Sequence, residues 1–196
     1  MDGHVPVVAI GSSADGITAL RALARGLGPG MPAAVVLVQH RAATSPSMLP
    51  KLLARVTPLC VKEAEHGEPL QAGTIYVAPV GAHVVVADGR LELRHGAKVA
   101  HARPSIDVLF ESVARVCGPR AIGVLMGGAG RDGAEGLAAI RRAGGATLVL
   151  DHAEARFPRM PREALAVDSH HTAWSLADLG PAITHLAYRF AKGVVV

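Results

Sequence analysis

Short apolar runs rich in β-branched residues alternate along this 196-residue chain with longer stretches in which Ala and Leu recur at helical spacing. Runs of this length that are apolar throughout are typical of strands buried on both faces. The pattern predicts strands at residues 5–10, 34–38, 59–62, 74–77, 121–126 and 146–150. It predicts helices at residues 17–27, 47–56, 105–116, 133–143, 161–166 and 178–191, and Gly180-Pro181 is expected to break the last stretch locally.

Two further short runs, at residues 83–87 and 91–94, flank Asp88-Gly89, a dipeptide that favours a tight hairpin turn. Strands separated by helices indicate a parallel sheet with helices on both faces. The sequence therefore predicts the α/β class: a doubly wound three-layer sandwich with a mostly parallel sheet plus an antiparallel hairpin. We expect residues 1–196 to form a single domain.

The composition of the chain excludes some classes of binding partner. Half of the residues are apolar and 18% are charged, which suits a packed core. Aromatic residues are 3% of the chain and the net charge is +4 without a basic block, so we expect no nucleic-acid partner. The first residues do not resemble a signal peptide, and no apolar run is long enough to span a bilayer. We therefore expect a cytoplasmic protein that is not an integral membrane protein.

Cysteine and histidine spacing gives no sign of a metal centre. Cys60 and Cys117 form no CxxC pair, and we expect two buried thiols. The neighbours His170 and His171 would point apart on a strand, so we assign them to a solvent-exposed loop. Trp174 is expected to be a packing residue. The sequence thus predicts no metal and no cofactor.

Residues that can carry chemistry follow the predicted strands. Ser13 comes after the first strand, His40 after the second, Asp132 after a glycine-rich loop, and Asp151 after the strand at residues 146–150. The carboxyl ends of parallel strands meet at one edge of a sheet. A serine hydroxyl becomes a nucleophile when an imidazole takes its proton, and a carboxylate orients that imidazole. Both Asp132 and Asp151 fit the last role.

The turn after the first strand, GSSADG, matches no phosphate-binding fingerprint. It lacks the second glycine of GxGxxG, the Gly-Lys of a P-loop and the last glycine of G-x-S-x-G. A nucleotide-binding domain is therefore a weak hypothesis. On its own, Ser13 could equally be a helix cap.

Six segments fall in an order that resembles the catalytic domain of chemotaxis receptor methylesterases, the CheB family. They are VAIGSSADGITAL, VVLVQHRA, GEPLQAGTIYVAP, RPSIDVLFESVA, GVLMGGAGRDGAEGL and RMPREAL. The resemblance implies an α/β hydrolase that removes methyl groups from receptor glutamates and can deamidate receptor glutamines. It implies a triad of Ser13, His40 and Asp132, with Ala14, Ala129 and Gly130 in the oxyanion and substrate loops. A methyl-accepting chemotaxis receptor or similar signalling protein is the implied partner.

The chain departs from the family pattern around this site. The family's ASTGG reads SSADG here, which places Asp15 beside the nucleophile, and its TGMGxDG reads GGAGRDG, with Gly127 for Thr. Arg159 replaces a glycine before MPREA. We also expect no receiver domain in this chain. A catalytically impaired member that binds a receptor or regulator is therefore the alternative hypothesis. His83, in APVGAH, is expected to have an accessory or packing role, and Pro104-Ser105 with Asp107 predicts a helix start.

Overall fold

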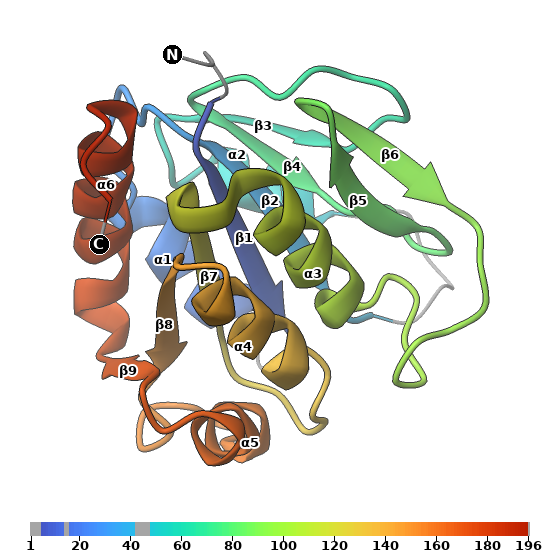
Figure 1. Ribbon diagram of the computed structural model, residues 1–196, viewed down its shortest axis with the longest axis vertical. Helices are drawn as coiled ribbons and strands as arrows, with labels where there is room; N and C mark the ends of the chain where they lie inside the picture. The colour runs from blue at the N-terminus through green and yellow to red at the C-terminus, as the bar shows by residue number, and fades with distance from the viewer. Residues whose placement is uncertain (1–4, 14–15, 42–47, 196) are drawn as a thin grey trace.

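A computed structural model describes residues 5–13, 16–41 and 48–195. Within them, parallel strands form one seven-stranded sheet in the order β3-β4-β2-β1-β7-β8-β9 (Figure 1). The strands are β1 (Val7–Ser12), β2 (Ala34–Gln39), β3 (Cys60–Glu63), β4 (Thr74–Val77), β7 (Ala121–Leu125), β8 (Ala146–Leu150) and β9 (Thr172–Trp174). A separate antiparallel hairpin joins β5 (His83–Ala87) to β6 (Arg90–Arg94). Its turn residues Asp88 and Gly89 have φ angles of 47° and 70°, which confirms the predicted hairpin.

Helices cover both faces of the sheet (Figure 1). They are α1 (Gly16–Gly26), α2 (Leu49–Ala54), α3 (Ile106–Cys117), α4 (Ala134–Arg142), α5 (Arg159–Val167) and α6 (Leu176–Ala191), with a short 3-10 turn η1 (Gly118–Arg120) after α3. One buried core joins the sheet to α3, α4 and the hairpin. A second core joins the opposite face to α1, α2 and α6.

The central strand β1 shows why its run is apolar throughout. Val7 and Ala9 belong to the core on the α3 side, whereas Val8 and Ile10 belong to the core on the α1 side. Both faces of the strand are therefore removed from water, which explains why Val7 to Ile10 are all apolar. The predicted doubly wound three-layer sandwich is confirmed.

The C-terminal part of the chain differs from the prediction. The short strand β9 was not predicted, and it is defined by its parallel pairing with β8. The expected break at Gly180-Pro181 is wrong, because α6 runs through Pro181 without interruption. Gly180 instead lets α6 approach α1, since a Cβ atom there would lie 2.6 Å from the Cα of Gly26.

Two expectations about burial are also corrected. Both cysteines are free, but Cys60 is exposed on the edge strand β3 and only Cys117 is half-buried. Burial raises the pKa of the Cys117 thiol to about 11. His170 is exposed as expected, whereas His171 is buried and its Nδ1 lies 2.9 Å from the hydroxyl of Thr147. In the described part of the chain, no helix is both long and apolar enough to cross a membrane.

Candidate active site

The site lies at the point where the order of the strands in the sheet reverses. β1 pairs with β2 on one side and with β7 on the other, so the loops after these strands separate and leave an opening. A cleft of about 580 Å³ occupies this opening. Ser13, His40, Gly130 and Asp132 all line it, so four of the predicted site residues meet there although 92 positions separate His40 from Asp132.

Ser13 follows β1 directly and is half-buried. Its N–H donates to the carbonyl oxygen of Gly127 at 3.0 Å, which holds it against the glycine loop after β7. The preceding Ser12 is fully buried, and its hydroxyl has no hydrogen-bond partner among the described residues. Ser13 is therefore the serine that reaches the cleft. Ala14 and Asp15 lie outside the described residues.

His40 follows β2, and its N–H donates to the carbonyl oxygen of Ser12 at 3.0 Å. Its imidazole Nε2 lies 2.8 Å from Oδ2 of Asp132. The other acidic candidate, Asp151, accepts a hydrogen bond at 2.9 Å from the N–H of Ala153 in its own loop. The structure thus pairs His40 with Asp132.

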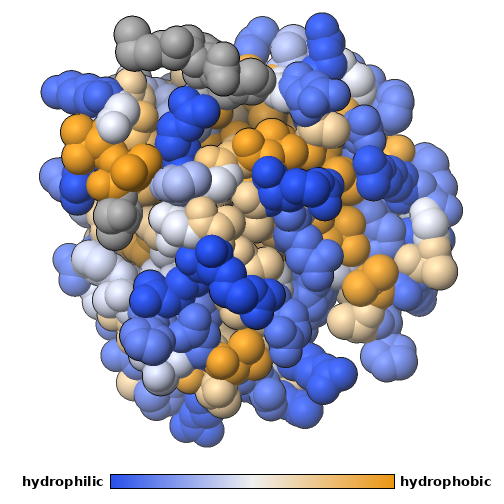
Figure 2. Space-filling model, in the orientation of Figure 1, coloured by the Kyte–Doolittle hydropathy of each residue, from blue (hydrophilic) through white to orange (hydrophobic). Residues whose placement is uncertain are grey.

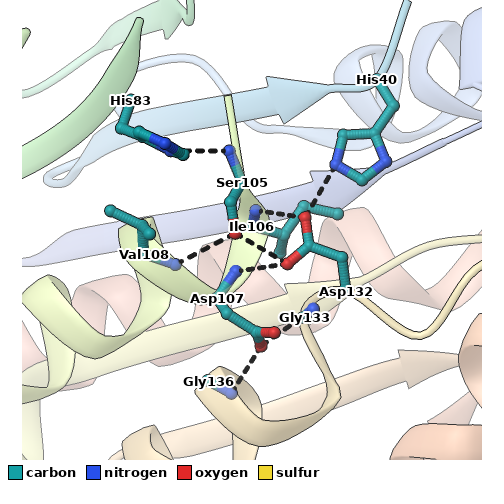
Figure 3. A network of polar contacts seen from close by, with 9 residues as sticks. All are labelled: His40, His83, Ser105, Ile106, Asp107, Val108, Asp132, Gly133 and Gly136. Carbon is teal, nitrogen blue, oxygen red and sulfur yellow. Dashed lines mark hydrogen bonds and ion pairs between the residues drawn. The ribbon is translucent and has the colours of Figure 1, made fainter. Parts of the chain in front are cut away.

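The carboxylate of Asp132 is 3% exposed and sits at the N-terminus of α3 (Figure 3). Oδ1 accepts from the Ser105 hydroxyl at 2.8 Å and from the Asp107 N–H at 3.0 Å, and Oδ2 accepts from the Ile106 N–H at 2.8 Å. These N–H groups have no partner within the helix, and the helix dipole favours an anion there.

Burial by itself would raise the pKa of Asp132. The hydrogen bonds from His40, from the α3 backbone and from the Ser105 hydroxyl outweigh burial, and they hold this pKa below its ordinary value. Asp132 is therefore a carboxylate, and His40 donates its Nε2–H to it. In the neutral imidazole with this tautomer, the lone pair is on Nδ1.

Asp107 fixes the loop that carries Asp132 (Figure 3). Its Oδ1 accepts from the N–H groups of Gly133 at 2.9 Å and Gly136 at 2.8 Å, so a side chain of α3 caps α4. Burial raises the pKa of Asp107 to about 7, and the negative charge of Asp132 acts in the same direction. The hydrogen bonds from Gly136 and Gly133 oppose this rise.

His83 supports the other side of α3. Its Nδ1 accepts from the N–H of Ser105 at 3.2 Å (Figure 3). Its Nε2–H donates to the carbonyl oxygen of Ala97 at 2.9 Å. The ring is buried and does not line the cleft. It joins the start of α3 to the segment that follows β6.

The glycine loop after β7 packs closely against Ser13. A Cβ atom on Gly128 would lie 1.9 Å from Sδ of Met160 and 2.6 Å from Cβ of Ser13. The N–H of Gly128 donates to the carbonyl oxygen of Phe157 at 2.8 Å, and the N–H of Met160 donates to that of Gly128 at 3.0 Å. Only a residue without a side chain fits between the start of α5 and Ser13.

Ala129 and Gly130 are the exposed part of this loop. Their N–H groups have no hydrogen-bond acceptor among the described residues. They are therefore free to bind an oxygen atom of a ligand. Gly130 lines the cleft directly, whereas Ala129 precedes it on the same turn.

Ser105 and Asp107 were recognised in the sequence only as part of a helix start. That signal is correct, since Ser105 caps α3. It does not say that the same helix end receives the carboxylate of Asp132. The arginine and lysine residues that line the cleft were given no role in the prediction from sequence. No group of three or more metal-ligating side chains gathers anywhere in the described ranges.

Comparisons with known proteins identify the family of this chain. A family model described as CheB methylesterase matches residues 8–183. A protein-glutamate methylesterase/protein-glutamine glutaminase of Anaeromyxobacter dehalogenans is 46% identical over 83% of this chain and 48% of that protein. The protein-glutamate methylesterase FrzG of Myxococcus xanthus is 40% identical over 91% of this chain and 54% of that protein. The chain thus spans about half the length of these curated relatives.

A solved structure gives the same fold. The catalytic domain of the CheB methylesterase of Thermotoga maritima superposes with a TM-score of 0.85 at 26% identity. The superposition covers 92% of this chain and 97% of that domain. The sequence match over residues 8–183 and the shared fold together show that the chain belongs to the CheB methylesterase family.

Proposed function

We propose that this chain hydrolyses glutamate methyl esters on the cytoplasmic part of chemotaxis receptors, and deamidates glutamine side chains there, through Ser13, His40 and Asp132. The names of its relatives support the reaction class. The observation that carries the proposal is the 2.8 Å contact between His40 and the buried Asp132, in the cleft that Ser13 also lines.

In the first step, the Ser13 Oγ attacks the carbonyl carbon of the ester. His40 takes the hydroxyl proton on Nδ1, because Nε2–H is already donated to Asp132. Asp132 stabilises the imidazolium that forms. The tetrahedral intermediate then breaks its bond to the methoxy oxygen, His40 returns the proton, and methanol leaves.

In the second step, water attacks the acyl-enzyme. His40 takes a proton from this water, and the second tetrahedral intermediate releases the Ser13 oxygen, which regains the proton. The products are a free glutamate and a restored serine. With a glutamine side chain the same sequence releases ammonia in place of methanol.

The negative oxygen of both intermediates needs hydrogen-bond donors. The N–H groups of Ala129 and Gly130 are our candidates, together with that of Ala14. One such donor is worth about 3–4 kcal/mol of transition-state stabilisation. The N–H of Gly128 is unsuited because it donates to Phe157.

The test is methanol release from a methylated receptor cytoplasmic fragment. We expect release by the chain and its loss in Ser13→Ala. Ser12→Ala is the matched control, because the buried Ser12 hydroxyl does not reach the cleft.

Equal release by Ser13→Ala would refute the serine mechanism. No release by any form of a well-folded sample, beside an active family member, would refute the proposed activity. It would favour a receptor-binding role.

A further inference from the structure

Most of the charged side chains that line the cleft around Ser13 are positive. Four side chains that are cationic at neutral pH line it: Arg41, Lys98, Arg103 and Arg131. Among the described lining residues Asp132 is the sole carboxylate, and it already accepts four hydrogen bonds.

The four cations differ in the groups that their side chains contact. Arg41 lies 3.8 Å from the half-exposed carboxylate of Glu63, and Arg103 donates at 2.6 Å to the carbonyl oxygen of Gly96. Lys98 and Arg131 are exposed and have no ion-pair partner within the described ranges. Their charge is therefore available to a ligand.

Two of the cations belong to a turn that the fold holds in a fixed position. Between Lys98 and Arg103, the backbone groups of Val99 and Ala102 hydrogen bond in both directions at 3.1 and 2.9 Å. Ala100 and His101 form the tip of this turn, and both line the cleft. Their backbone lies in the left-handed region, with φ angles of 48° and 65°. Residues other than glycine rarely adopt this conformation, and the surrounding structure must hold them in it.

The base of this turn is anchored to the site. The carbonyl oxygen of Ala97 accepts from His83, which also accepts from the N–H of Ser105 at the start of α3. The same helix end receives Asp132. A chain of hydrogen bonds thus positions the backbone of this turn relative to the triad, so Lys98 and Arg103 lie beside the cleft before a substrate arrives.

Apolar side chains are also present near this turn, since Val99 within it is exposed and Val80 lines the cleft. Hydrophobic side chains on the face in Figure 2 form small groups separated by hydrophilic ones. A macromolecular substrate that enters the cleft therefore contacts the four cations as well as apolar side chains.

We propose that Arg41, Lys98, Arg103 and Arg131 select ester substrates by the acidity of the flanking sequence, so that the preferred substrate is a polypeptide in which the esterified glutamate lies among free carboxylates. The inference rests on the proposed function, since it concerns the substrate of that same site. Hydrolysis converts a neutral ester into one more carboxylate. The same cations therefore bind the product more tightly than the substrate, and the unesterified acidic peptide acts as a competitive inhibitor.

The test compares two peptides that differ only beside the methyl-esterified glutamate, with glutamate on both sides in one and serine in the other. At about 0.01 M salt, where the Debye length is roughly 30 Å, we expect kcat/KM to be about 3- to 10-fold higher for the acidic peptide. At about 1 M salt the Debye length is roughly 3 Å, and the ratio should approach one.

A charge-matched pair of variants assigns the effect to the cleft. Lys98→Gln combined with Arg131→Gln, which removes the two cations without an ion-pair partner among the described residues, should lower the low-salt ratio toward one. Lys192→Gln combined with Arg115→Gln removes the same charge from exposed positions outside the cleft and should leave the ratio as it is in the unmodified chain. A ratio of one in the unmodified chain, or a ratio that the cleft variant does not change, would overturn the inference.

Failure of the proposed function gives a different result. Neither peptide would then release methanol, and binding of the unesterified acidic peptide would be followed by fluorescence anisotropy. Salt-sensitive binding that weakens in the cleft variant but not in its control supports the charge selection. Binding that is absent, or equal in both variants, contradicts it.

Discussion

Gly128→Ala is the substitution that most directly tests whether the glycine loop positions Ser13. The φ angle of Gly128 lies outside the left-handed region, so alanine meets no backbone obstacle. The added Cβ would lie 1.9 Å from Sδ of Met160 and 2.6 Å from Cβ of Ser13. An unstrained carbon contact is roughly 3.5 Å, so Ser13 must move by about 1 Å.

The two contacts have different consequences. Met160 is a flexible side chain at the start of α5, and its displacement from a tightly packed position is expected to cost about 1–3 kcal/mol of unfolding free energy. The Cβ of Ser13 is attached to the backbone, so its displacement moves the nucleophile itself. A misplacement of about 1 Å is expected to lower kcat by about 100-fold.

Urea unfolding and methanol release separate these effects. Adding Gly128→Ala to a Met160→Ala background should cost less stability than adding it to the unmodified chain, while the loss of kcat persists. Gly130→Ala is the stability control from the same loop, because its Cβ would meet no atom closer than the backbone nitrogen of Asp132 at 4.0 Å. A Gly128→Ala protein with unchanged stability and unchanged kcat would refute the reasoning.

Three further predictions concern buried polar groups. Burial raises the pKa of Asp107 to about 7 from its ordinary value of 3.8, so its contribution to stability is complete below pH about 4 and is lost as the pH rises through about 7. Asp107→Asn keeps an acceptor for the N–H groups of α4 but has no carboxyl group to titrate. In urea unfolding at a series of pH values, this variant should reduce the fall in unfolding free energy by about 1–2 kcal/mol, after allowance for solvent screening. An unchanged slope would contradict this. Asp132→Asn should lower kcat for methanol release by about 10⁴-fold because it removes the anion that stabilises the imidazolium, and a loss below tenfold would exclude that role. Ser12→Ala should raise the unfolding free energy by about 1 kcal/mol in thermal or urea unfolding, because the buried hydroxyl has no partner within the described residues; a loss of stability would show that it has one.

The local pattern of apolar and polar residues was sufficient to predict most strands of the sheet. The bounds of β4 and β8 agree with prediction at both ends, because each is an apolar run surrounded by polar or turn residues. The strand β9 could not be found in this way. It is three residues long and mostly exposed, and only its pairing with β8 makes it a strand.

The order of the residues along the chain was enough to predict the α/β class, the hairpin and the reactive residues at the strand ends. Each of these follows from local composition, from the period of the apolar residues or from a short motif. The positions of the residues left open whether Asp132 or Asp151 faces His40, and only the family resemblance implied Asp132. Nothing in the sequence indicated that α3 would hold this carboxylate. These contacts depend on the folded chain, because the hydrogen bonds concerned join residues that lie 25–92 positions apart and exist only once β1, β2 and β7 are side by side.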